Sequence, residues 1–195
     1  MSSKPTFLKR KFFSLLIPGT VSLIVVTVLL LSDSVIAGLT LGEDAVAAIS
    51  LVTPAYSLAA FFAGMISVGV PILYSKAMGE FKKDEADRYF ALGFTAALAI
   101  GSIMAGGLFV FGDLYLRSYN ASEAVFNHAH AYFFWYKLTI MLTALNMLLS
   151  EMVLADGDET LSLVSSLVQV VGNIVLSVVL SRFFGMAGIA FASFA

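Results

Sequence analysis

The chain has 195 residues, of which 59% are hydrophobic and only 12% are charged, and its formal net charge is −2. Soluble domains carry roughly 25% charged residues, so this composition cannot cover a water-facing surface and indicates an integral membrane protein. The absence of cysteine excludes disulfides and thiolate metal sites. The sequence has no basic patch with interleaved aromatic residues, and we therefore expect no nucleic-acid partner.

Long runs without charge predict membrane helices, because about 20 apolar residues in a helix cross a bilayer. Lipid-facing β-strands alternate over about ten residues, whereas these runs are continuous, so we predict an all-α polytopic bundle. Five complete transmembrane helices and the incomplete start of a sixth are expected at approximately 11–40, 44–77, 86–115, 123–154, 159–182 and 186–195. Because the last run is too short to cross, we expect residues 1–195 to be a fragment of a longer protein.

Lysine and arginine are concentrated before the first predicted helix and in the segment 75–89, between the second and third helices. The segment between the first and second helices has none, and the one between the third and fourth has only Arg117. Basic residues favour the cytoplasmic side of the membrane. The distribution predicts a multi-pass protein with a cytoplasmic N-terminus.

Small residues recur every four positions on two predicted helices, which lets helix backbones approach closely in lipid. We expect close packing at Ala55, Ala59, Ala63 and Ser67 on the second helix, and at Gly93, Ala97, Gly101 and Ala105 on the third.

Asp33 is the only charged residue between Phe12 and Gly42. A charge at the bilayer centre costs roughly 2.5–3.5 kcal/mol on insertion scales, which makes such a residue a functional candidate. Its neighbours one helical turn away are apolar and cannot pair with it. Either Asp33 marks the outer end of the first span, or it is a working group held inside the membrane.

The fifth predicted helix carries a polar stripe of residues spaced three or four apart. At 100° per residue these side chains share about one quarter of the helix surface. Such a stripe either bonds to neighbouring helices or lines a wet cavity, and its length slightly favours the cavity. Its members are Ser162, Ser166, Gln169, Asn173 and Ser177.

The fourth predicted helix contains Lys137 and Glu151. Glu151 is expected at the cytoplasmic interface, whereas Lys137 either extends to the outer interface or pairs with Asp33. His128 and His130 face different sides of this helix, so we expect no two-histidine metal site. The sequence has no glycine-rich phosphate loop, serine–histidine arrangement or HExxH, and we expect neither an enzyme nor a bound cofactor.

Several segments resemble the multidrug and toxin extrusion (MATE) transporters. Residues 9–51 are similar to the family's first helix and following turn, with a basic tail, Ile17-Pro18, Asp33 and a turn from Gly38 to Gly42. SKAMGEFKKDEADR resembles the family's cytoplasmic loop, and LADGDETLSL its turn between the fourth and fifth helices. GNIVLSVVL and FGMAGIAFAS resemble the fifth helix and the start of the sixth.

The resemblance implies a two-lobe fold of six helices each, of which this chain is most of the N-terminal lobe. It implies antiport coupled to H⁺ or Na⁺, with export of amphiphilic, often cationic, drugs or toxins across the plasma membrane. The implied partners are such a small molecule, the lipid bilayer and the C-terminal lobe of the same chain.

Carried over to this sequence, the family's proton or coupling-ion site consists of Asp33, Asn173, Ser177 and Ser193. Ser177 replaces a carboxylate, and Ser193 keeps only the hydroxyl of a threonine. The loss of one carboxylate weakens a dedicated sodium site, because hard cations prefer anionic oxygens, although Asp33 and Asn173 could still bind Na⁺.

The expected mechanism neutralises Asp33, whose charged form is disfavoured by burial. The first helix, weakened near Pro18, would then repack and shrink a cavity lined by Gln169, Ser166 and Lys137.

Two other functions stay open from the sequence. A lipid-linked precursor flippase of the same superfamily is one, although such proteins often carry more basic cavities and the spans here hold only Lys137. The other is a membrane assembly subunit without transport, in which the polar stripe would join helices.

Overall fold

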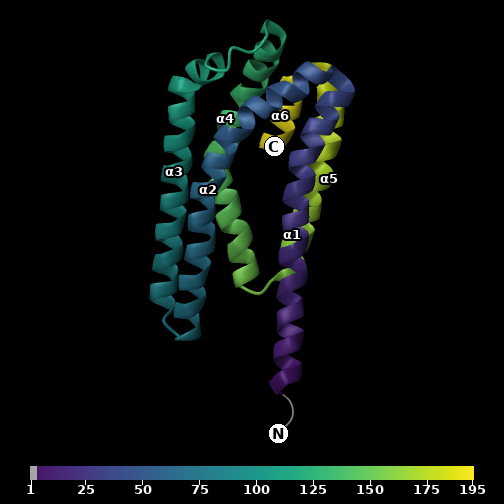
Figure 1. Ribbon diagram of the computed structural model, residues 1–195. Coiled ribbons are helices and arrows are strands. Elements are labelled where there is room, and N and C mark those ends of the chain that lie inside the picture. The colour runs from purple at the N-terminus through teal and green to yellow at the C-terminus, as the bar shows by residue number, and fades with distance from the viewer. Residues whose placement is uncertain (1–3) are drawn as a thin grey trace.

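The computed structural model describes residues 4–195, although some side chains between residues 4 and 30 are not described. Six helices follow one another in chain order, and no strand occurs in the described range. They are α1 (Lys4–Leu41), α2 (Glu43–Gly79), α3 (Lys83–Arg117), α4 (Glu123–Ala155), α5 (Glu159–Phe184) and α6 (Met186–Phe194), as Figure 1 shows. The predicted fold class, an all-α polytopic bundle, is confirmed.

Four helices, α2 to α5, are long and apolar enough to cross a membrane. In α1, the corresponding apolar helix in the described part covers Thr27–Leu41. The helix itself begins at Lys4, whereas we expected a span from residue 11. The proposed weak point at Pro18 lies outside the described side chains.

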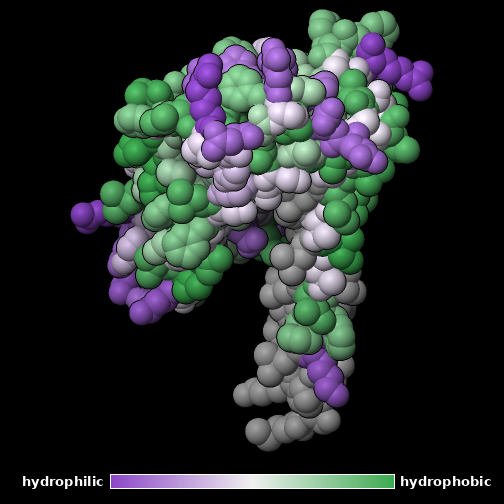
Figure 2. Space-filling view, turned by 45° about the horizontal axis from the view of Figure 1, so that its top comes forward, coloured by the Kyte–Doolittle hydropathy of each residue, from purple (hydrophilic) through white to green (hydrophobic). Residues whose placement is uncertain are grey.

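The helices form two groups. In one group α2, α3 and α4 pack against one another, and in the other α1 and α6 pack against α5. The groups meet where α6 packs against α4 and α1 packs against α2, at the end of the molecule that carries the α1–α2 turn (Figure 1). Figure 2 shows the surface hollowed between the bulk of the molecule and the arm that contains α1.

Small residues allow α2, α3 and α4 to approach closely, as the four-residue spacing predicted. Gly93, Gly101 and the alanines between and beyond them on α3 are buried, and so is the matching row on α2. At Gly101 an added Cβ would overlap the backbone carbonyl of Met141 on α4. At Gly93 it would lie 2.6 Å from a methyl group of Val70 on α2.

Two glycines turn the chain sharply around the place where the groups meet. Gly42, between α1 and α2, has φ 92°, and Gly185, between α5 and α6, has φ 57°. Both values lie in the left-handed region that glycine adopts without steric penalty. After the first turn α2 leaves α1 and packs against α3 and α4, whereas after the second turn α6 packs back against α5 and also contacts α4.

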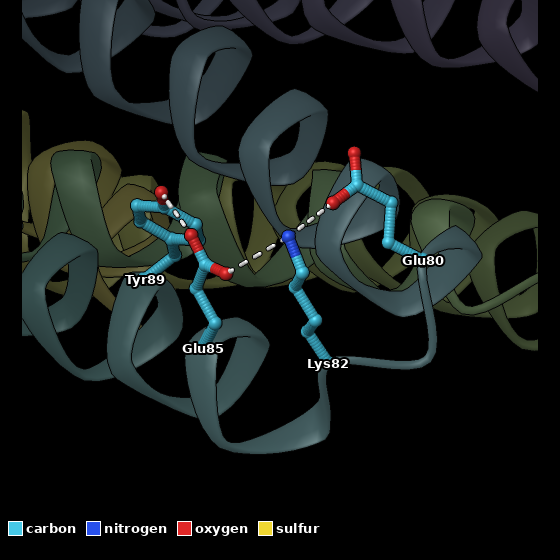
Figure 3. A network of polar contacts seen from close by, with 4 residues as sticks. All are labelled: Glu80, Lys82, Glu85 and Tyr89. Carbon is cyan, nitrogen blue, oxygen red and sulfur yellow. Dashed lines mark hydrogen bonds and ion pairs between the residues drawn. The ribbon is translucent and has the colours of Figure 1, made fainter.

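At the opposite end, a polar network surrounds the α2–α3 turn (Figure 3). Lys82 Nζ lies 2.6 Å from Glu80 Oε2 and 3.9 Å from Glu85 Oε2, and the Tyr89 hydroxyl donates to Glu85 Oε1 at 2.9 Å. The hydrogen bond and charge of Lys82 hold the pKa of Glu80 below its usual value. All these groups face solvent, so the network orders the turn and contributes little stability.

We expect Gly101→Ala to lower the thermal unfolding midpoint of the protein. The added methyl meets backbone rather than a movable side chain, and overpacking of this kind costs about 1–3 kcal/mol. Gly106→Ala on the same helix is the matched control, because an added Cβ there has no neighbour within 4 Å. An unfolding midpoint that is equally unchanged in both variants would contradict the close packing of α3 on α4.

Candidate functional site

Asp33 lies inside α1 rather than at its end. The helix continues from Asp33 to Leu41, roughly 12 Å along its axis at 1.5 Å per residue. The side chain is buried, with 8% of its surface exposed. The carboxylate is therefore enclosed by the helix bundle.

One oxygen of this carboxylate accepts two hydrogen bonds. Ser193 of α6 donates its hydroxyl to Asp33 Oδ2 at 2.7 Å, and Tyr132 of α4 donates to the same oxygen at 3.1 Å. Asn173 of α5 donates its side-chain amide to Ser193 Oγ at 3.2 Å. The structure therefore brings together Asp33, Asn173 and Ser193, which come from three different helices.

The other carboxylate oxygen has no partner. In the described part of the chain, the fully buried side-chain polar atoms without a hydrogen bond are Asp33 Oδ1, Asn173 Oδ1 and Ser177 Oγ. Ser177 lies close enough to the Asp33 carboxylate to interact with it, although its hydroxyl makes no hydrogen bond of ordinary geometry. Buried polar atoms in proteins are nearly always paired, so three unpaired oxygens in one cluster mark a place where a ligand or proton can bind.

The donor set defines the chemistry available here. A carboxylate, an amide oxygen and a hydroxyl are oxygen ligands of the kind that hard cations prefer. Only one of the three carries a charge, and no cluster of three histidine, aspartate or glutamate side chains occurs among the described residues. The site fits a proton or a singly charged cation better than a divalent metal.

The sequence reasoning missed Tyr132. This residue is 2% exposed, and its ring packs on Tyr136 one turn further along α4, with the two centroids 5.0 Å apart. The available signal was a pair of hydroxyl-bearing aromatic residues, Tyr132 and Tyr136, spaced one turn apart on one face of α4. Tyr132 provides the contact from the α2–α4 group to Asp33.

The polar stripe on α5 divides into two parts. Asn173 and Ser177 are buried at the Asp33 cluster, whereas Gln169 is exposed and Ser166 is half-buried. Ser166 donates its hydroxyl to the Ser162 carbonyl at 2.9 Å, which satisfies it within its own helix. Gln169 makes no hydrogen bond with the other described residues, and its side chain is exposed.

Lys137 does not form the pair with Asp33 that was one of the two possibilities left open by the sequence. No ion pair between the two occurs among the described residues, and Lys137 instead packs against α3, with Nζ 5.2 Å from the Phe109 ring centroid. Five positions separate Tyr132 from Lys137 on α4, so the two residues face different sides of the helix. Glu151 is exposed near the end of α4 at Ala155, as expected for an interfacial position.

A comparison with protein families supplies the identification. The MatE family model matches residues 18–179, a range that includes Asp33, Tyr132, Asn173 and Ser177. The chain belongs to the MatE family. Members of this family are transporters, so the chain is a MatE transporter and a multi-pass membrane protein, which confirms the resemblance. Neither the curated proteins nor the solved structures contained a match.

Tyr132→Phe removes one of the two hydrogen bonds to Asp33 without changing the packed ring. A hydrogen bond to a charged group contributes about 1.5–3 kcal/mol, so we expect a lower thermal unfolding midpoint. Tyr136→Phe is the matched control, since no hydrogen bond of the Tyr136 hydroxyl is made within the described residues. Equal midpoints in the two variants would show that the Tyr132–Asp33 contact does not stabilise this MatE protein.

Proposed function

We propose that this MatE transporter is a cation-coupled antiporter, driven by H⁺ or Na⁺, that exports amphiphilic, often cationic, drugs or toxins. Asp33 is the coupling residue. The observation that carries the proposal is the asymmetry of its carboxylate, in which Oδ2 accepts two hydrogen bonds and buried Oδ1 accepts none.

A proton binds at Oδ1 in this proposal, because Oδ2 is already occupied by two donors. The new O–H group then needs an acceptor, and Asn173 Oδ1 is a buried acceptor of the same cluster without a partner. Proton binding makes the side chain neutral, which the buried environment favours.

Sodium would bind as the alternative coupling ion through the unpaired oxygens of Asp33, Asn173 and Ser177. The ion neutralises the carboxylate as a proton does. Ser177 offers a hydroxyl where a second carboxylate would bind more strongly, so we expect weak Na⁺ affinity and favour the proton.

Neutralising Asp33 weakens the contact between the two helix groups. Hydrogen bonds to an ionised group are about twice as strong as those between neutral groups. The bond from Tyr132 joins α4 to α1, and its strength therefore depends on the charge of Asp33. Movement of the α1–α5–α6 group against α2–α4 would change the hollow between them and expel substrate.

The proposed substrate path uses the exposed part of the α5 stripe. Gln169 and Ser166 line the cavity in this proposal, while the surrounding valines and leucines of α5 contact the apolar part of an amphiphile. Lys137 is left out because it faces α3. We place the protein in the plasma membrane with its N-terminus in the cytoplasm, on the basis of its lysine and arginine distribution.

We expect Asp33→Asn to reduce substrate export by about tenfold or more in proteoliposomes that contain the full-length protein. The amide cannot exchange a proton and carries no charge for Na⁺. Substrate efflux is measured with an imposed H⁺ gradient and, separately, with an imposed Na⁺ gradient. Asp44→Asn is the matched control, because Asp44 is exposed at the start of α2.

Export by Asp33→Asn at the wild-type rate under both gradients would refute the coupling role of Asp33. A loss under the H⁺ gradient alone would identify the proton as the coupling ion.

A further inference from the structure

Lys137 is a buried ammonium group without an anionic partner. Its side chain is 8% exposed, and Nζ lies 5.0 Å from the ring centroid of Phe133 and 5.2 Å from that of Phe109. These cation–π contacts are its only polar interactions with the residues that the structure describes. The proposed transport mechanism does not use this group.

The two rings satisfy Lys137 only in part. Cation–π contacts contribute about 0.5–2 kcal/mol, but an ammonium also has three N–H groups that need acceptor atoms. The adjacent carboxylate on α3, Asp113, faces His130 of α4 at 3.6 Å instead. Lys137 therefore has unused charge and unused donors.

The ammonium is open to a ligand. The Nζ atom of Lys137 makes no hydrogen bond with the described residues. In the described chain, the side-chain polar atoms that are both fully buried and unpaired belong only to Asp33, Asn173 and Ser177. Because Nζ is not one of them, it keeps some accessible surface. Gly112 leaves room for it, since an added Cβ there would lie 3.1 Å from Nζ. The side chain thus lies mostly enclosed in the seam between α3 and α4, with a small accessible area at Nζ.

The charge of Lys137 lies near the end of α3 that leads into the α3–α4 loop. Gly112 precedes the end of α3 at Arg117 by roughly 7.5 Å of helix rise. The polar region on each side of a bilayer is roughly 5–7 Å thick. An α3–α4 loop at the membrane surface would therefore place the ammonium near the inner edge of the polar region of that leaflet.

Apolar side chains continue from the charge along the same seam. Phe109 and Phe134 are exposed large aromatic residues whose rings are 6.4 Å apart, and Val110 beside them is exposed as well. An acyl chain that follows these residues toward the middle of the membrane would keep its phosphate next to Lys137.

We propose that the α3–α4 seam binds an anionic phospholipid, with Lys137 on its phosphate and the acyl chains over Phe109 and Phe134. The phosphate oxygens accept the free N–H groups of Lys137, and the negative charge compensates the ammonium. An anionic lipid is preferred over a zwitterionic one because it adds no second cation near Lys137. This inference does not rest on the proposed transport function.

The test uses full-length protein in detergent, titrated with phosphatidylglycerol or phosphatidylcholine, with the thermal unfolding midpoint as the readout. We expect phosphatidylglycerol to raise the midpoint of the wild type more than phosphatidylcholine does. For Lys137→Met we expect an apparent affinity about tenfold weaker. Lys137→Arg should retain binding, because a guanidinium also binds phosphate.

Two variants separate the site from general charge effects. Lys83→Met removes an exposed lysine of α3 and should bind phosphatidylglycerol as the wild type does. Gly112→Ala keeps the ammonium but displaces it, and should weaken binding several-fold even if Lys137→Met folds poorly.

Unchanged phosphatidylglycerol affinity in Gly112→Ala and in folded Lys137→Met would overturn the proposal. So would an equal loss of affinity in Lys83→Met, or an equal effect of phosphatidylcholine. Stabilisation of the wild type by inorganic phosphate at the same concentration would show that the site takes phosphate rather than lipid.

Discussion

The hydrogen bond from Tyr132 to Asp33 joins the two halves of this structure. One partner belongs to the α2–α4 group and the other to α1, which packs with α5. Apart from this bond, the two groups are connected mainly where α6 packs against α4, and α4 has little contact with α5. A charge on Asp33 strengthens the hydrogen bond from Tyr132, and loss of the charge weakens this bond.

Such a contact is useful only if the carboxylate stays out of water. Ser193 and Tyr132 replace water on one oxygen, and the unpaired Oδ1 leaves the charge incompletely compensated. The cluster therefore compensates the charge in part and leaves Oδ1 unpaired, which is where our proposal places the coupling proton or ion. The same helices hold Lys137, whose charge is compensated by aromatic rings and, in our proposal, by lipid.

Composition and charge-free runs are sufficient to predict the helices, because the bilayer requires long apolar segments. The small-residue spacing also predicts which faces of α2 and α3 are buried. The rotation of each helix is harder to predict, since apolar residues surround most of the helix circumference. Tyr132 was missed, and the sequence left two positions open for Lys137, because the surroundings of both residues depend on how α4 is rotated. The pattern of charge and polarity singled out Asp33 and Asn173, but Ser193, and the grouping of all three into one site, came from the family resemblance, because they are far apart in the sequence.

The most direct test of the account measures the distance between the two helix groups as the charge of Asp33 changes. The chain has no cysteine, so spin labels can be attached to cysteines at exposed Leu73 on α2 and Val164 on α5. Double electron–electron resonance spectra are compared in acidic and alkaline buffer, with and without Na⁺. We predict a distance distribution that shifts with pH in the wild-type background and stays in the acidic form in Asp33→Asn. A distribution that does not respond to pH or Na⁺, or that responds equally in Asp33→Asn, would contradict the account.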